Sequence, residues 1–171
     1  LRELNKRGID YRGVLYAGLM MTKAGPKVLE FNCRFGDPET QAILPRWDGD
    51  LIPALEACAG GALSDGMVRW KPEACVCVVM AAGGYPGNYR KGDVIDGLAD
   101  VAAMKDVVVF HAGTKLDGGR VVTAGGRVLG VTALGRDLRA AVDRAYAAGS
   151  RIRFAGAHYR RDIAARALHA K

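Results

Sequence analysis

The chain has 171 residues, of which 50% are apolar and 25% charged, proportions that are ordinary for a folded globular protein and exclude a disordered one. Its 25 lysines and arginines against 18 acidic residues give a formal charge of +7, which favours anionic partners, but the basic residues are dispersed along the chain. The longest uninterrupted apolar run, from Ala74 to Ala82, is too short for a membrane-spanning helix, which needs about twenty residues.

A β-hairpin is predicted near the start of the chain. Residues 1–8 have the pattern of the end of a helix that stops at Gly8. Two strands follow, at about residues 11–22 and 28–34, joined by a turn at residues 23–26. Apolar residues occupy both faces of the first strand, which favours an inner position in a sheet.

The two faces of the second strand differ in character. Alternation places the apolar Leu29, Phe31 and Cys33 on one face, expected to be core, and the polar Glu30, Asn32 and Arg34 on the other. Glu30 and Asn32 lie about 6.6 Å apart along such a strand, so their oxygens can converge on Mg²⁺, while the Arg34 guanidinium can meet a phosphate or carboxylate. An exposed strand with solvated polar side chains explains the same spacing, so the pattern alone leaves both interpretations open.

A turn and a short helix are predicted next. Gly36 and Pro38 end the strand, and the helix would continue through residues 40–44. Asp37 would then lie at or near the helix N-cap, where backbone N–H groups favour an anion. Helix capping and substrate contact explain Asp37 and Glu39 equally well.

The remaining pattern predicts a second, β-rich lobe. A helix from Asp50 to Gly60 is followed by a weakly periodic junction at residues 62–72. Strands are then predicted at residues 74–82, 106–111, 119–123 and 127–133, the last two joined in a hairpin through residues 124–126, and helices at 137–148 and 161–168. This order indicates an α+β fold with two domains, residues 1–70 and 71–171.

The other motifs indicate no further chemistry. Residues 83–87 (Gly-Gly-Tyr-Pro-Gly) do not follow the order of a phosphate-binding loop and favour a turn. His111 and His158 are isolated in the sequence and favour structural roles. The four cysteines lack metal-binding spacing, and Cys75 and Cys77 are expected to be buried thiols on one strand face, which favours a reducing, cytosolic setting.

The strand pattern Glu30-x-Asn32-x-Arg34 resembles the metal-binding strand of ATP-grasp ligases. Its continuation through residues 34–41 (RFGDPETQ) resembles the signature of the glycinamide ribonucleotide synthetase family, also called phosphoribosylamine-glycine ligases. The resemblance covers nearly the whole chain and includes residues 11–18, 84–87, 111–114 and 125–129. It is a resemblance to the C-terminal portion of these enzymes, and it implies that further ATP-grasp and N-terminal domains lie upstream in the same polypeptide.

The resemblance also implies an activity. The family joins glycine to 5-phosphoribosylamine through glycyl phosphate, with ATP as co-substrate, in the cytoplasmic de novo synthesis of purines. Glu30 and Asn32 match the family's ligands for Mg²⁺ (or Mn²⁺). Arg34 is the candidate for contacting the ATP phosphates and stabilising the transferred phosphoryl group, and Asp37 and Glu39 are candidates for substrate contacts. The nucleotide-gripping lysine would lie upstream, so residues 1–171 alone are expected to be inactive.

One position departs from the wider ATP-grasp pattern. Tyr16 falls near the place where a neighbouring strand often supplies a second carboxylate, which argues against a fully occupied two-metal site. Two alternatives stay open: another ATP-grasp carboxylate-amine ligase with the same Glu30 and Asn32 chemistry, and a basic nucleic-acid-binding module, which only the charge of +7 favours. The expected partners are ATP, glycine and 5-phosphoribosylamine, with neither a nucleic acid nor a membrane among them.

Overall fold

The computed structural model describes residues 1–169, and the chain divides into two compact units. The first unit comprises Leu1–Thr40 and Trp47–Lys71, and the second comprises Gln41–Arg46 together with the chain from Pro72 onward. Helices and antiparallel strands occur in both units, which confirms the predicted α+β class. The assignment of residues 1–70 and 71–171 to two domains stays a prediction.

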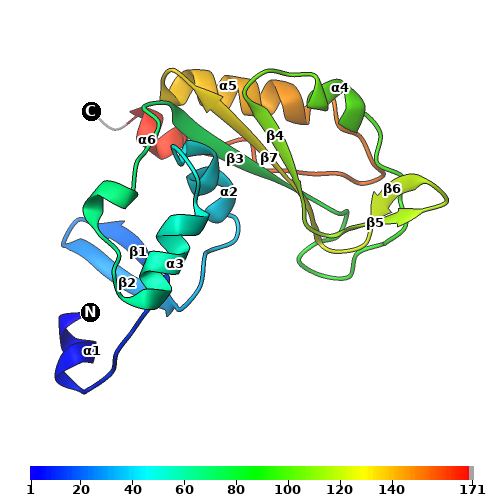
Figure 1. Cartoon of the computed structure of the whole chain (residues 1–171). Coiled ribbons are helices and arrows are strands. Elements are labelled where there is room, and N and C mark those ends of the chain that lie inside the picture. The colour runs from blue at the N-terminus through cyan, green and yellow to red at the C-terminus, as the bar shows by residue number, and fades with distance from the viewer. Residues whose placement is uncertain (170–171) are drawn as a thin grey trace. The chain divides into compact units, whose positions relative to one another are not determined.

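The first unit is organised around an antiparallel hairpin of β1 (Tyr16–Thr22) and β2 (Gly25–Asn32), shown in blue in Figure 1. Gly25, with a φ of 93°, closes the turn in a conformation that favours glycine. The same unit contains α1 (Arg2–Lys6), α3 (Ile52–Gly60) and a 3₁₀ turn at Asp65–Met67.

Two expectations about this hairpin are wrong. β1 begins at Tyr16, and within residues 1–169 its only strand neighbour is β2, so it is not an inner strand. The face of β2 that was expected to be core is exposed, with Leu29 65% and Phe31 62% accessible and Cys33 also at the surface. The physical reason is that no helix or sheet in the described part of the chain covers this face.

The second unit is built on a three-stranded antiparallel sheet in the order β3-β7-β4. These strands are β3 (Ala74–Ala81), β7 (Arg127–Gly135) and β4 (Val107–His111), and α5 (Leu138–Gly149) packs along the sheet (Figure 1). β7 is buried along almost its whole length because it has a strand on each edge and α5 packs against it. The helix predicted at residues 137–148 is confirmed, and Asp137 caps it by accepting a hydrogen bond from the Ala140 N–H at 2.8 Å.

The hairpin predicted through residues 124–126 is wrong. β7 pairs with β3 and β4, and the hairpin is formed instead by β5 (Thr114–Asp117) and β6 (Arg120–Thr123). Gly118 and Gly119, with φ of 54° and 77°, supply the two left-handed residues that its tight turn requires. The unit also contains a 3₁₀ turn at Leu44–Arg46 and the short helices α4 (Leu98–Ala102) and α6 (Ala165–His169), and α2 (Thr40–Ile43) begins at the last residue of the first unit's opening segment.

Three of the segments that carry the family resemblance meet in the second unit, where glycines allow backbone to touch backbone. The carbonyl of Gly113 accepts the N–H of Gly125 at 3.1 Å, and a Cβ at Gly113 would lie only 2.5 Å from the Cα of Gly125. The ring of Tyr85 lies directly over Gly126, where a Cβ would overlap it. Larger residues at Gly113 and Gly125 therefore cannot fit without moving a loop, and one at Gly126 would have to displace the Tyr85 ring.

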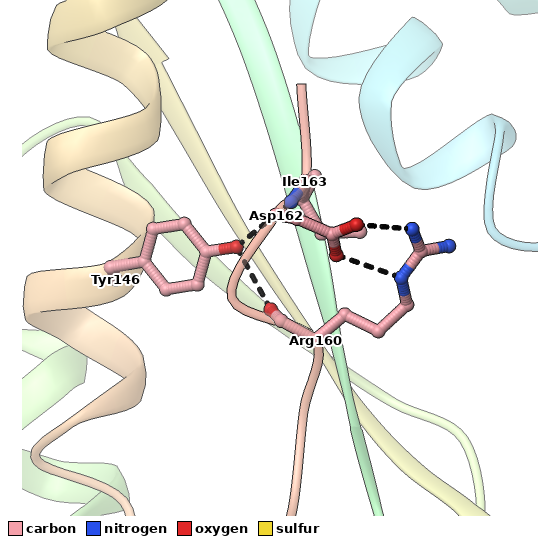
Figure 2. A network of polar contacts seen from close by, with 4 residues as sticks. All are labelled: Tyr146, Arg160, Asp162 and Ile163. Atoms are coloured by element: carbon pink, nitrogen blue, oxygen red, sulfur yellow. Dashed lines mark hydrogen bonds and ion pairs between the residues drawn. The ribbon is translucent and has the colours of Figure 1, made fainter. Parts of the chain in front are cut away.

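The segment before α6 is tied to α5 by Tyr146 (Figure 2). The Tyr146 hydroxyl donates to the carbonyl of Arg160 at 2.8 Å and accepts the N–H of Ile163 at 3.1 Å. Beside it, the exposed guanidinium of Arg160 makes hydrogen bonds of 2.9 and 2.7 Å to Asp162. The ring of Tyr159 lies 6.0 Å from that of Tyr146. One side chain thus fixes the path of the C-terminal segment.

Candidate functional site

Glu30 and Asn32 lie on one face of β2, as their spacing predicts. The Asn32 amide Nδ2 donates to Oε1 of Glu30 at 2.9 Å. Across the hairpin, Glu30 faces Gly18 and Asn32 faces Tyr16. A Cβ at Gly18 would lie 3.1 Å from Cγ of Glu30, so the glycine clears the space over which the Glu30 side chain extends.

The chemistry of this pair fits Mg²⁺ in part. The hydrogen bond uses Nδ2 of Asn32 and therefore leaves its amide oxygen out of the contact, so the pair offers hard carboxylate and amide oxygens on one face. Residues 1–169 contain no group of three or more His, Cys, Asp or Glu side chains placed to hold a metal ion. Two protein ligands suit an ion that keeps waters and binds substrate phosphates, and do not make a protein cage.

Arg34 lies beyond the strand instead of on its polar face. β2 ends at Asn32, and the Arg34 guanidinium donates to the backbone carbonyl of Phe35 at 2.9 Å. The Arg34 side chain remains exposed, so its guanidinium has donors to offer to an anion. The structure does not bring it into contact with Glu30 or Asn32 through any hydrogen bond among the described residues.

The turn at residues 36–40 differs from the prediction. α2 begins at Thr40, so Asp37 lies in the turn before the helix and not at its N-cap. The backbone N–H and the hydroxyl of Thr40 both donate to the carbonyl of Gly36, which fixes the turn. Glu39 is half-buried in this turn, whereas Asp37 is exposed. The predicted position of Asp37 at the helix N-cap is therefore wrong, and its contact with a substrate stays a prediction.

Tyr16 and Glu39 make a contact that sequence reasoning missed. The Tyr16 hydroxyl donates to Oε1 of Glu39 at 3.2 Å. Partial burial, and then the neighbouring Glu39 and Glu30 carboxylates, raise the pKa of Tyr16 above its ordinary value. The carboxylates of Glu30 and Glu39 therefore both act on one hydroxyl. The only sequence signal was the departure at Tyr16, because nothing in the spacing of residues 16 and 39 predicts a contact.

His111 and the cysteines make local contacts or lie partly buried. Nδ1 of His111, at the end of β4, lies 3.0 Å from the hydroxyl of Thr114, at the start of β5. None of the four cysteines forms a disulfide, and Cys75 and Cys77 are half-buried instead of buried because they lie on the less covered face of β3. Burial raises the pKa of Cys75 to about 11, so its thiol is a poor nucleophile at neutral pH.

Comparison with known proteins identifies the family. A model of the phosphoribosylglycinamide synthetase C domain matches residues 75–166. The chain belongs to the phosphoribosylglycinamide synthetase family. The ATP-grasp (A) domain model of the same synthetase matches residues 1–40, the segment that contains the hairpin, Glu30 and Asn32. Within the described residues, no helix combines the length and apolar character of a membrane span.

Individual relatives are similar in sequence to nearly the whole chain. A phosphoribosylamine-glycine ligase of Synechocystis is 60% identical over 96% of the chain and 40% of its own length. The chicken trifunctional purine biosynthetic protein adenosine-3 is 53% identical over 96% of the chain and 16% of its own length. The chain therefore spans about two fifths of the length of the bacterial relative that it matches.

Solved structures agree with the synthetase assignment. The crystal structure of a phosphoribosylamine-glycine ligase from Thermotoga maritima superposes with a TM-score of 0.78 and 36% identity, over 94% of this chain and 39% of that one. The N5-carboxyaminoimidazole ribonucleotide synthetase of the same organism has a TM-score of 0.60 at 15% identity, over 84% of this chain and 37% of that one, which shows a shared fold.

Proposed function

We propose that this chain is part of an ATP-dependent ligase that joins glycine to 5-phosphoribosylamine through glycyl phosphate, giving glycinamide ribonucleotide, ADP and phosphate. The observation that carries the proposal is the 60% identity, over 96% of the chain, to a phosphoribosylamine-glycine ligase. The polar face of the hairpin supports it, because Glu30 and Asn32 present oxygen ligands together on β2.

In this proposal Glu30 and Asn32 would hold Mg²⁺ (or Mn²⁺), and the ion would neutralise charge on the ATP phosphates. The glycine carboxylate attacks the γ-phosphoryl group of ATP and displaces ADP, which gives glycyl phosphate. The amine of phosphoribosylamine then attacks the carbonyl carbon of glycyl phosphate, forms the amide with loss of a proton, and releases phosphate. Arg34, exposed beside the end of β2, contacts the phosphates and stabilises the transferred group through its planar donors. Asp37 and Glu39 contact the substrates.

The proposal extends to the rest of the polypeptide. Residues 1–70 would complete an ATP-grasp domain whose earlier part, with the N-terminal domain, lies upstream, and residues 71–171 would form the C domain. The exposed apolar face of β2 supports this view, since a longer chain supplies a layer to cover it. Four cysteines without a disulfide suit a cytoplasmic enzyme of de novo purine synthesis. Residues 1–171 alone should show no turnover.

The test measures ADP release by the full-length protein with Mg-ATP, glycine and freshly generated phosphoribosylamine. Release should require both co-substrates and fall by at least about 100-fold in Glu30→Gln, which removes a charged ligand. Glu56→Gln, an exposed position on α3, is the matched control and should retain activity. Release without glycine, or an unimpaired Glu30→Gln variant, would contradict the proposal and point to another carboxylate substrate of an ATP-grasp ligase.

A further inference from the structure

Tyr16 and Glu39 lie beside the polar face of the hairpin. Tyr16 is the direct cross-strand neighbour of Asn32, and such neighbours have Cβ atoms about 4.5–5.5 Å apart. Its hydroxyl donates to Oε1 of Glu39 at 3.2 Å. The carboxylate of Glu39 is thereby brought toward the strand face that carries Glu30, although 23 residues separate Tyr16 from Glu39 in the sequence.

The Glu39 carboxylate accepts the Tyr16 hydroxyl at Oε1 and lies against Gly36 at Oε2. A Cβ at Gly36 would overlap its Oε2, so this glycine leaves the space that the carboxylate occupies. The turn beneath is fixed by Thr40, whose N–H and hydroxyl both bond to the Gly36 carbonyl. Over the part of the chain that the structure describes, Glu39 is partnered by a hydroxyl and by no lysine or arginine. It is thus an oriented, half-buried negative charge whose counter-charge is not built into this unit.

The proposed substrate supplies such a counter-charge. An α-amino acid must place its carboxylate at the γ-phosphoryl group, next to the ion held by Glu30 and Asn32. Its ammonium group is then only two bonds away and needs an acceptor on the same face that is not itself a metal ligand. A carboxylate with a neutral hydroxyl donor accepts a primary ammonium group well, since the hydroxyl orients the carboxylate without cancelling its charge.

We infer that Glu39 accepts the ammonium group of the amino-acid substrate and that Tyr16 is the positioning residue that holds Glu39 in place. The inference rests on the proposed function and deepens it by assigning the recognition of the glycine amine. Glu30 and Asn32 would serve the metal and phosphates, and Glu39 the amine.

The experiment uses the full-length protein with Tyr16→Phe, Glu39→Gln and the double variant. Glu39→Gln should lower kcat/KM for glycine by about 30-fold to 100-fold, because a charged hydrogen bond is lost. Tyr16→Phe should raise the KM for glycine by about 3-fold to 10-fold, and the double variant should match Glu39→Gln within about twofold, since Tyr16 acts through Glu39. The KM for ATP and the Mg²⁺ concentration for half-maximal rate should not change.

Two comparisons separate recognition from general damage. Glycolate has a neutral hydroxyl in place of the ammonium group, so the preference for glycine over glycolate should fall in Glu39→Gln by about the same factor as kcat/KM. Tyr11→Phe is the matched control, since Tyr11 donates to the carbonyl of Val14, and its KM for glycine should equal that of the wild type.

Other outcomes would overturn the inference. A higher Mg²⁺ requirement in Glu39→Gln would make Glu39 a metal ligand, and additive losses in the double variant would give Tyr16 an independent role. Unchanged glycine constants in Tyr16→Phe and Glu39→Gln would remove both residues from recognition while the proposed function stood. A wild-type protein without glycine-dependent ADP release would instead refute the proposed function itself.

Discussion

β2 and β7 are strands of eight and nine residues, each in an antiparallel sheet, and they differ in how far their apolar side chains are exposed to solvent. In β7, Leu129 and Val131 are 1% and 0% exposed, whereas in β2 Leu29 and Phe31 are 65% and 62% exposed. β7 has a strand on each edge and α5 packed against it, but β2 has one strand neighbour and no covering layer in the described chain. An apolar strand face therefore indicates that the face favours burial against another layer. Only the surrounding elements show whether such a layer is present.

The two units also differ in what they contribute: the second contains the hydrophobic core, and the first contains the candidate metal-binding pair. The second unit contains both clusters of buried apolar residues, built around β3, β7 and α5. The first unit contains the polar pair of Glu30 and Asn32, on a hairpin that the described chain leaves largely open. Replacing apolar residues by alanine should thus lower the free energy of unfolding much more in β7 than in β2. Substitutions of Glu30 or Asn32 in β2 should leave the fold of the second unit unchanged.

The largest expected effect compares two leucines. Leu129→Ala should lower the free energy of unfolding of the second unit by about 2–5 kcal/mol, because it creates a cavity in a closed core. Leu29→Ala should change the stability of the first unit by no more than about 0.5 kcal/mol, because the side chain is already exposed. Urea unfolding followed by circular dichroism measures the first change. Tryptophan fluorescence measures the second, since Trp47 and Trp70 both lie in the first unit.

The second prediction asks whether a longer chain covers β2. In residues 1–171, Phe31→Ala should have little effect on stability. In the full-length polypeptide that we propose, the same substitution should cost about 3–5 kcal/mol, the loss typical of a buried phenylalanine. Thermal unfolding of both lengths, each beside its own wild type, measures the difference. Equal and small losses at both lengths would show that this face stays open.

A smaller effect is expected at the C-terminal segment. Tyr146→Phe should destabilise the second unit by about 1–2 kcal/mol, because the carbonyl of Arg160 loses a donor and the N–H of Ile163 loses an acceptor. Asp162→Asn alters only an exposed ion pair and should leave the urea midpoint unchanged. A larger shift for Asp162→Asn than for Tyr146→Phe would assign the tie to the ion pair instead.

The smallest effect depends on pH. The N–H of Ala140, and then Arg136, lower the pKa of Asp137 below its ordinary value. Its contribution to stability is therefore complete above the unfolded pKa of about 3.9 and is lost as pH falls through the lower folded pKa. Asp137→Ala should be less stable than wild type at pH 7, and the gap should narrow on acidification in urea midpoints.

Local patterns predicted part of this structure well. Alternation placed Glu30 and Asn32 on one face because the strand period is two residues, and the apolar spacing of residues 137–148 located α5. The β5-β6 hairpin was missed because the turn signal at residues 124–126 was assigned to the wrong pair of strands. Which strands pair is decided by the tertiary fold. The sequence of a strand such as β7, which pairs on both edges, does not indicate which strands are its neighbours.

The site shows the same limit. Tyr16 and Glu39 meet because the turn at residues 36–40 folds back toward β1, and this geometry depends on the Gly36 carbonyl and Thr40. Composition predicts a turn there but not its direction. The helix also starts at Thr40 instead of nearer Pro38, which moves Asp37 out of the capping position.

The contact between Gly113 and Gly125 has a consequence for which substitutions the protein can accept. Where side chains meet, a lost methyl group on one can be offset by a larger neighbour, so compensating pairs of substitutions exist. Where backbone touches backbone, as at Gly113, no neighbouring side chain can shrink to make room for a new Cβ. A scan of all single and double substitutions should therefore find that these glycines have no second-site suppressors, although they contribute no side-chain contact of their own.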